Sequence, residues 1–202
     1  MTVLPILLLS AGARAGEIRA KVLDGDKPLE GAVVYVVSAP GKFTGDGEAV
    51  MDQVKQEFVP RVLPVLAGTK VRFPNKDNIQ HHIYSFSKAK KFDVLLYKNE
   101  PAEPVVMDQP GVVKLGCNIH DWMLGYVLVL PNPYFARAGA DGVAVIKNVP
   151  QGKYKVAACS ERVKGEPEET AEAVTVGAKA ASVELRPKVA AARKPKKSAV
   201  TY

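Results

Sequence analysis

The 202-residue sequence predicts an all-β protein built from β-sandwiches. Short runs of alternating apolar and polar residues recur along the chain, and Gly, Pro, Asn and Asp separate them, as in strands joined by turns. No segment sustains the 3.6-residue period of an amphipathic helix. Once the two ends are set aside, about 170 residues remain, which is enough for one or two hydrophobic cores.

The first 15 residues have most features of an export signal. Residues 1–15 contain an apolar run that is too short to span a membrane, and Ala13-Arg-Ala15 follows it as an Ala-x-Ala cleavage pattern. The positive charge expected before the apolar run is missing, so either the segment is atypical or the true start lies further upstream. We expect cleavage after Ala15 and an exported, periplasmic protein.

Residues 16–45 and 132–187 have the strand pattern of one sandwich in two parts. The first part contains a predicted hairpin around the turn Asp24-Gly25, and the same style continues over residues 140–156, 173–176 and 182–185. The phrases from Asp24 to Val34 and from Asp141 to Tyr154 resemble those of carboxypeptidase-regulatory-like modules. This resemblance implies a discontinuous β-sandwich, with the intervening residues inserted into it or packed beside it.

Residues 46–131 form the second predicted domain. The stretch from Phe58 to Phe73 alternates apolar and polar residues on both sides of Ala67-Gly68, which predicts two short strands. A further strand follows Pro110-Gly111 and ends at Cys117.

The segment Cys117-Asn-Ile-His120-Asp-Trp-Met123 carries the strongest functional signal. It places a thiolate, an imidazole and a thioether on one short loop, and these are ligand types of a mononuclear blue copper centre, which needs one further histidine. With 3 His and 4 Met in 202 residues, a given Cys would have His at +3 and Met at +6 by chance only about 3 times in 10,000.

The further histidine must come from an upstream strand, and the chain offers two neighbours, His81 and His82. Side chains of adjacent strand residues point to opposite faces, so both can enter one pocket only if the strand is bulged. The residues alone leave this choice open.

From about Gln56 to Leu130 the chain resembles the cupredoxins, the family of plastocyanin and amicyanin. The resemblance rests on Phe58-Val-Pro, on Ala67-Gly-Thr, on Phe73-Pro-Asn75 with a His six residues after the Asn, on Gly111 and on the Cys loop, whose spacing is similar to that of amicyanin. It implies a Greek-key β-sandwich and one type 1 copper ligated by His81, Cys117, His120 and Met123. His82 falls where these relatives carry Asn, which implies a second-sphere residue.

The expected function is therefore one-electron transfer between redox partner proteins, without enzymatic catalysis. His120 would lie near the surface, where Trp122 either contributes to a docking patch or only covers the core. The amicyanin-like loop suggests methylamine utilisation as one pathway. The alternative is a periplasmic β-sandwich module that binds a carbohydrate or a partner protein, or that stores copper.

Charge and the second cysteine add two expectations. The net charge is +7, but residues 186–202 hold six basic and no acidic residues, so the folded part is nearly neutral. We expect residues 188–202 to be a disordered basic tail capable of weak contact with an anionic membrane surface. Nucleic-acid binding is not expected, because no aromatic residues are interleaved with these charges. Cys159 is expected to be a free, buried thiol.

Overall fold

The computed structural model describes residues 15–99, 101 and 103–192, which form 18 strands and one short 3₁₀ helix, η1 (Pro167–Thr170). The predicted fold class, with one sandwich in the centre of the chain and a second made by its flanks, is confirmed. None of the described residues belongs to a helix that is long and apolar enough to cross a membrane. The predicted signal segment lies outside these residues except for Ala15.

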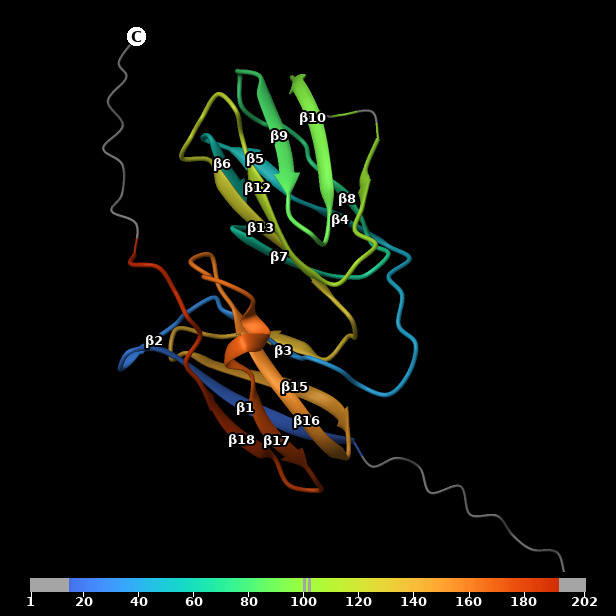
Figure 1. The fold of residues 1–202 in the computed structure, drawn as a ribbon, viewed down its shortest axis with the longest axis vertical. Coiled ribbons are helices and arrows are strands. Elements are labelled where there is room, and N and C mark those ends of the chain that lie inside the picture. Colours follow the sequence, from blue (N-terminus) through green and yellow to red (C-terminus); the bar gives the residue numbers. More distant parts are fainter. Residues whose placement is uncertain (1–14, 100, 102, 193–202) are drawn as a thin grey trace, which may run out of the picture.

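The two flanking segments fold together into one sandwich, here called the flanking module. Its strands are β1 (Ala15–Asp24), β2 (Lys27–Pro28), β3 (Val33–Val36), β14 (Phe135–Arg137), β15 (Val143–Pro150), β16 (Gly152–Cys159), β17 (Glu172–Val176) and β18 (Ala181–Leu185). One sheet has the order β15-β1-β18, with β2 paired to β1, and the other has the order β14-β3-β16-β17 (Figure 1). Chain segments far apart in sequence therefore complete each sheet.

The residues between the flanks form the central module. Its strands are β4 (Glu48–Val50), β5 (Asp52–Val54), β6 (Glu57–Val59), β7 (Val62–Leu66), β8 (Lys70–Arg72), β9 (His81–Phe86), β10 (Lys91–Tyr97), β11 (Val105–Val106), β12 (Gly111–Gly116) and β13 (Leu124–Leu130). A five-stranded sheet of order β10-β9-β12-β13-β7 packs against the smaller β11-β8-β4 sheet and the β5–β6 hairpin.

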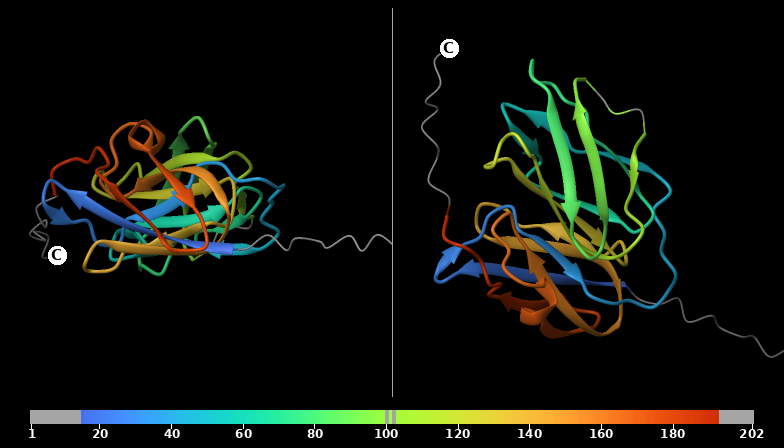
Figure 2. Two further views of the ribbon diagram at one scale, coloured as in Figure 1. Left: turned by 90° about the horizontal axis from the view of Figure 1, so that it is seen from below. Right: turned by 45° about the horizontal axis from the view of Figure 1, so that its top comes forward.

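Three hydrophobic cores are stacked along the molecule, because several strands are buried on both faces. In β3, Val34 and Val36 enter the core of the flanking module, while Val33 and Tyr35 enter a core between the modules. In β13, Val127 and Val129 enter the core of the central module, and the intervening residues face the flanking module. Figure 2 shows the two modules in contact from two further directions. The two modules therefore pack on each other through this shared hydrophobic core.

The five-stranded sheet positions the candidate site at one of its ends. His81 is the first residue of β9, Cys117 follows the last residue of β12, and the two strands pair antiparallel with Gly116 opposite Tyr84. The start of β9 and the end of β12 therefore share one edge, which lies away from the flanking module (Figure 1).

The start of the predicted basic tail is ordered, which differs from the expectation of disorder from residue 188 onward. Val189 forms a β-bridge with Val163, and the backbone of Lys188 and Ala190 is hydrogen-bonded to residues 162 and 164. The Arg162 side chain also donates to the Ala190 carbonyl. These hydrogen bonds fix the start of the tail against residues 162–164. The amino-acid composition of the tail does not predict this pairing.

Candidate metal centre

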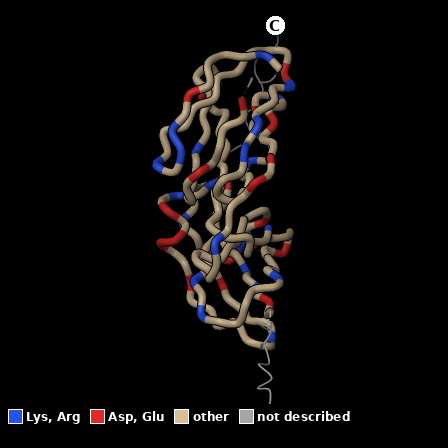
Figure 3. Tube along the Cα trace, turned by 90° about the vertical axis from the view of Figure 1, so that its right-hand side faces the viewer, with Lys and Arg blue, Asp and Glu red and all other residues tan. Residues whose placement is uncertain are grey.

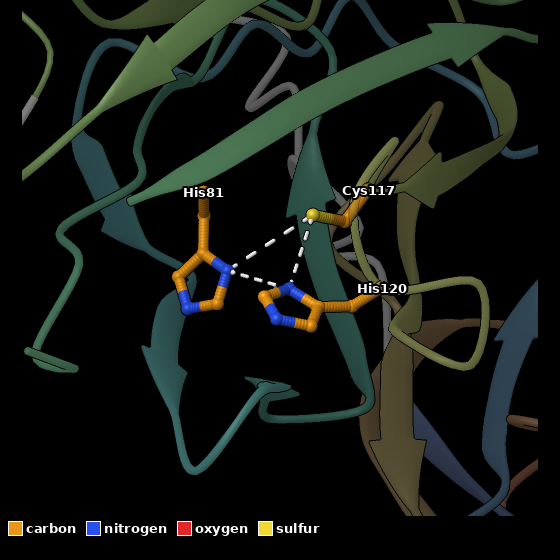
Figure 4. A group of neighbouring side chains, drawn as sticks. All are labelled: His81, Cys117 and His120. Carbon is orange, nitrogen blue, oxygen red and sulfur yellow. Dashed lines mark hydrogen bonds between the residues drawn. The ribbon is translucent and has the colours of Figure 1, made fainter. Parts of the chain in front are cut away.

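His81, Cys117 and His120 converge on one buried point (Figure 4). Their ligand atoms all lie within 4.8 Å of one another. The two histidines present their Nδ1 atoms to each other at 3.2 Å. The Cys117 Sγ lies 4.0 Å from Nδ1 of His81 and 3.6 Å from Nδ1 of His120. Two imidazole nitrogens and one thiol sulfur thus surround a space of the size of a metal ion.

Local chain geometry brings Cys117 and His120 together. The loop between β12 and β13 is short, and the Met123 N–H donates to the His120 carbonyl at 2.8 Å, which closes a tight turn. His81 comes from the neighbouring strand β9, as the sequence argument required for a ligand on the opposite side. The site therefore depends on one loop and one cross-strand pairing.

Met123, the fourth predicted ligand, is buried at the same end of the core. It belongs with Cys117 to the hydrophobic core of the central module, and both residues line one cavity of about 530 Å³. Met123 and Cys117 therefore share one cavity wall, and Met123 remains the predicted fourth ligand.

His82 points away from this cluster, as expected for the next residue along a strand. Its Nε2 contacts the Asp93 carboxylate on β10, and its ring packs 5.7 Å from that of Tyr84. The structure thus separates the two candidate histidines and places only His81 with Cys117 and His120.

Asp77 contacts the ring nitrogen of His81 that faces away from the cluster, and it was not identified from the sequence. His81 Nε2 lies 2.9 Å from the Asp77 carboxylate, which also accepts the backbone N–H groups of Lys55 at 2.6 Å and Gln56 at 2.8 Å. Burial raises the pKa of Asp77, but the bonds from Gln56, His81 and Lys55 outweigh it, so the pKa is lowered. An anionic Asp77 favours the tautomer that carries its proton on Nε2, which leaves the Nδ1 lone pair of His81 free for a metal.

His120 is also prepared to act as a ligand. Burial lowers its pKa, and the neighbouring His81 adds to this effect, although Asp77 opposes it. The lowered pKa favours neutral imidazole, which is the form that binds metals. His120 is 9% exposed, and its ring packs edge-on against that of Trp122, with centroids 5.3 Å apart. We call the exposed apolar residues within two positions of a ligand in the sequence, Ile79, Ile119 and Trp122, the apolar rim.

Cys159 does not compete for Cys117. Both cysteines are free, and Cys159 lies in the core between the modules, not in the core that holds Cys117. Burial, assisted by Glu168 and Glu166, raises the pKa of Cys159 to about 12. It therefore stays a protonated thiol, and among the described residues Cys117 is the one cysteine whose sulfur lies with the two histidines.

The donor set fits copper better than the common alternatives. A thiolate, two imidazoles and a thioether are soft or intermediate donors that suit both copper oxidation states. Magnesium and calcium prefer oxygen ligands, and structural zinc sites complete a tetrahedron with Cys, His or carboxylate. A His₂Cys cluster whose loop also carries Met123 therefore points to copper.

No protein-family model and no curated protein matches the chain. Among solved structures, it is similar to a purple cupredoxin from Nitrosopumilus maritimus, with 24% identity over 42% of this chain and 99% of that chain and a TM-score of 0.36. It is similar to the reduced Cu(I) form of an amicyanin mutant, with 22% identity, 48% and 97% coverage and a TM-score of 0.38. A copper-containing nitrite reductase from Thermus scotoductus matches with 21% identity, 48% and 25% coverage and a TM-score of 0.40.

Proposed function

We propose that the protein is a type 1 copper electron carrier that binds one copper through His81, Cys117, His120 and Met123. The observation that carries this proposal is the buried convergence of two Nδ1 atoms and one Sγ within 4.8 Å. A bound copper would supply the one-electron Cu(I)/Cu(II) couple.

The chain contributes a site whose donors are already in place. His81 is held by Asp77, and a backbone hydrogen bond from Met123 to His120 closes a turn at the end of the loop that follows Cys117. Donors fixed in this way have little room to rearrange when the charge of the site changes, and a small rearrangement favours fast electron transfer.

His120 offers one route for electrons to a partner. Its ring contacts Trp122 of the apolar rim, and exposed apolar side chains can be desolvated by a docking protein at low cost. We infer that redox partners dock there, with His120 between them and the metal. We also propose a periplasmic location, which the export-like residues 1–15 support. We propose a role in methylamine oxidation, which the Cys-x₂-His-x₂-Met spacing supports.

Copper loading combined with voltammetry tests this function. The mature protein should take up one Cu(II) per chain and cycle reversibly between two oxidation states by one electron. Uptake of several coppers, or one copper that does not cycle, would favour copper storage. No uptake at all would leave a β-sandwich binding module as the better account.

A further inference from the structure

The sheet face of the flanking module that packs on the central module is only partly covered. Along β16, Val156 points into the core of the flanking module and Ala157 points into the core between the modules. Because strand side chains alternate between the two faces, Lys153 and Lys155 lie on the same face as Ala157. Both lysines are exposed, so the central module does not cover this end of β16.

An open cleft of about 750 Å³ lies at this uncovered end of the sheet. It is lined by Lys153, by Lys155 and by Ala173, which lies opposite Lys155 in the pairing of β16 with β17. The chain that leaves β3, residues 37–40, and the turn at residues 151–152 complete the lining. All these residues belong to the flanking module, so the cleft is separate from the candidate metal centre.

Two basic residues and no acidic residue line the cleft. Neither Lys153 nor Lys155 forms an ion pair with a described residue. Glu172 precedes Ala173 in the chain, but it lies opposite Val156 and therefore points to the other face of the sheet. The positive charge of the cleft is thus not neutralised from its own sheet face.

The acidic residues of the η1 segment belong to a different cleft. Glu166 and Glu168 line a neighbouring cleft that shares only Val37 with this one. Glu168 accepts a hydrogen bond from the buried Tyr35 hydroxyl, and Lys88 lines the same neighbouring cleft as a balancing charge. Lys and Arg are interspersed with Asp and Glu over both modules in the view of Figure 3. A basic cleft without acidic lining residues is therefore a local feature.

The surroundings of the cleft favour a hydrophilic ligand. Every exposed large apolar residue among those described lies between residues 50 and 122, in the central module. The described part of the flanking module therefore lacks the exposed apolar anchors on which protein interfaces depend. Tyr154 lines the cleft but is only 7% exposed, so it offers no ring on which a nucleic-acid base could stack. Ser38 and Gln151 add a hydroxyl and an amide, which hydrogen-bond to hydroxyl-rich ligands.

We propose that this cleft binds an acidic glycan, whose carboxylate or sulfate groups pair with Lys153 and Lys155 and whose hydroxyls hydrogen-bond to Ser38 and Gln151. Strand residues two positions apart are separated by about 7 Å, which favours a ligand with several charged groups over one small anion. The inference goes beyond copper carriage, because it concerns the other module and needs no bound metal. Such binding holds the carrier on an anionic polysaccharide while the metal end of the central module stays free.

Isothermal titration calorimetry of the full chain tests the charge, with a galacturonate oligosaccharide and a sulfated oligosaccharide as the two acidic ligands. At least one of them should bind, and a neutral malto-oligosaccharide should bind at least about tenfold more weakly. Lys153→Gln with Lys155→Gln should weaken acidic-ligand binding by about tenfold or more. The control is Lys21→Gln with Lys147→Gln, which removes the same charge from β1 and β15 and should change the affinity by less than about twofold. Equal weakening in the two double variants would place binding elsewhere, for example on the basic residues 193–197, and would overturn the proposal.

Ala173→Phe tests the position of the ligand without a change in charge. The larger side chain fills space beside Lys155, so it should abolish binding of the acidic oligosaccharide. Ala180→Phe, in the exposed turn between β17 and β18, is the matched control and should bind as the parent does. Unchanged binding by Ala173→Phe would refute the cleft as the site.

Two further measurements separate this proposal from its alternatives. Tighter binding of an oligo-aspartate than of either acidic oligosaccharide would replace the glycan with an acidic protein. Copper uptake and cycling are measured on the same chain, and their failure would refute the proposed copper function while leaving the glycan result standing.

Discussion

At the scale of single residues, proximity in sequence decides what can be predicted. Cys117, His120 and Met123 lie within seven positions, so their spacing alone identifies them as possible ligands of one metal. The role of Asp77 could not be predicted from spacing, because its carboxylate accepts backbone hydrogen bonds from Lys55 and Gln56, more than 20 residues earlier. Both of those residues have positive φ, at 53° and 59°, in the turn between β5 and β6. Only the folded hairpin gives Asp77 its role.

Asp77→Asn should weaken Cu(II) binding by about 10- to 100-fold, which is the usual effect of removing a partner that orients a metal-bound histidine. It should also raise the reduction potential, because loss of a nearby negative charge destabilises Cu(II) more than Cu(I). Competition with a chelator and voltammetry measure the two effects. Asp46→Asn, which removes one exposed carboxylate from the segment between β3 and β4, is the matched control and should change neither.

The two adjacent histidines should respond differently to replacement. His81→Ala removes a donor from the cluster and should abolish blue-site spectra, whereas His82→Ala, on the opposite face of β9, should keep the colour with only a modest shift in potential. Absorption spectra recorded after identical copper loading make the comparison. Loss of colour in the His82 variant alone would transfer the ligand role to His82.

At the scale of elements, alternation predicted strands well but did not reveal which were buried on both sides. β1 alternates in burial over much of its length, while β13 continues Val-Leu-Val-Leu to its end and is buried throughout from Gly125 to Leu130. A continuous apolar run of this kind is typical of a strand covered on both faces. The sequence of β13 alone does not show that a second sandwich covers its outer face, so the apolar run could not be interpreted in advance.

Glycines on neighbouring strands should differ in their tolerance of a methyl group. A Cβ at Gly125 would lie 2.7 Å from Cβ of Phe58, which is fully buried and cannot retreat. Gly125→Ala should therefore lower the free energy of unfolding by about 1–3 kcal/mol. At Gly116 the contact is the far end of the half-buried Tyr84 ring, which can swing outward, so Gly116→Ala should cost about 1 kcal/mol or less. Urea unfolding of the metal-free variants compares them, and equal midpoints would contradict this account.

At the scale of the whole molecule, the arrangement of the modules follows from one shared core. Cys159 and Ala157 on β16 meet Leu128 and Leu130 on β13 in that core, so the two sandwiches stack through their sheets. The sequence predicted two sandwiches and a discontinuous flanking module. It could not predict which faces meet, because each partner strand looks like an ordinary core strand of its own domain.

Leu128→Ala should reveal the contribution of this shared core to stability. Leu128 is fully buried between the modules, and truncating such a side chain typically costs about 2–5 kcal/mol in unfolding free energy. Leu95→Ala, at a site 74% exposed, is the control and should change stability by no more than about 0.5 kcal/mol. Thermal unfolding that is identical for both variants would mean that the modules do not pack together in solution.

The copper spectrum of a Cys117→Ser variant tests the central claim most directly. The parent protein loaded with Cu(II) should show an intense thiolate-to-copper charge-transfer band, and Cys117→Ser should lose it while circular dichroism shows an intact β fold. Cys159→Ala, which removes the other thiol from the core between the modules, should keep the band. A band that survives in Cys117→Ser, or that disappears only in Cys159→Ala, would contradict a copper centre built on His81, Cys117, His120 and Met123.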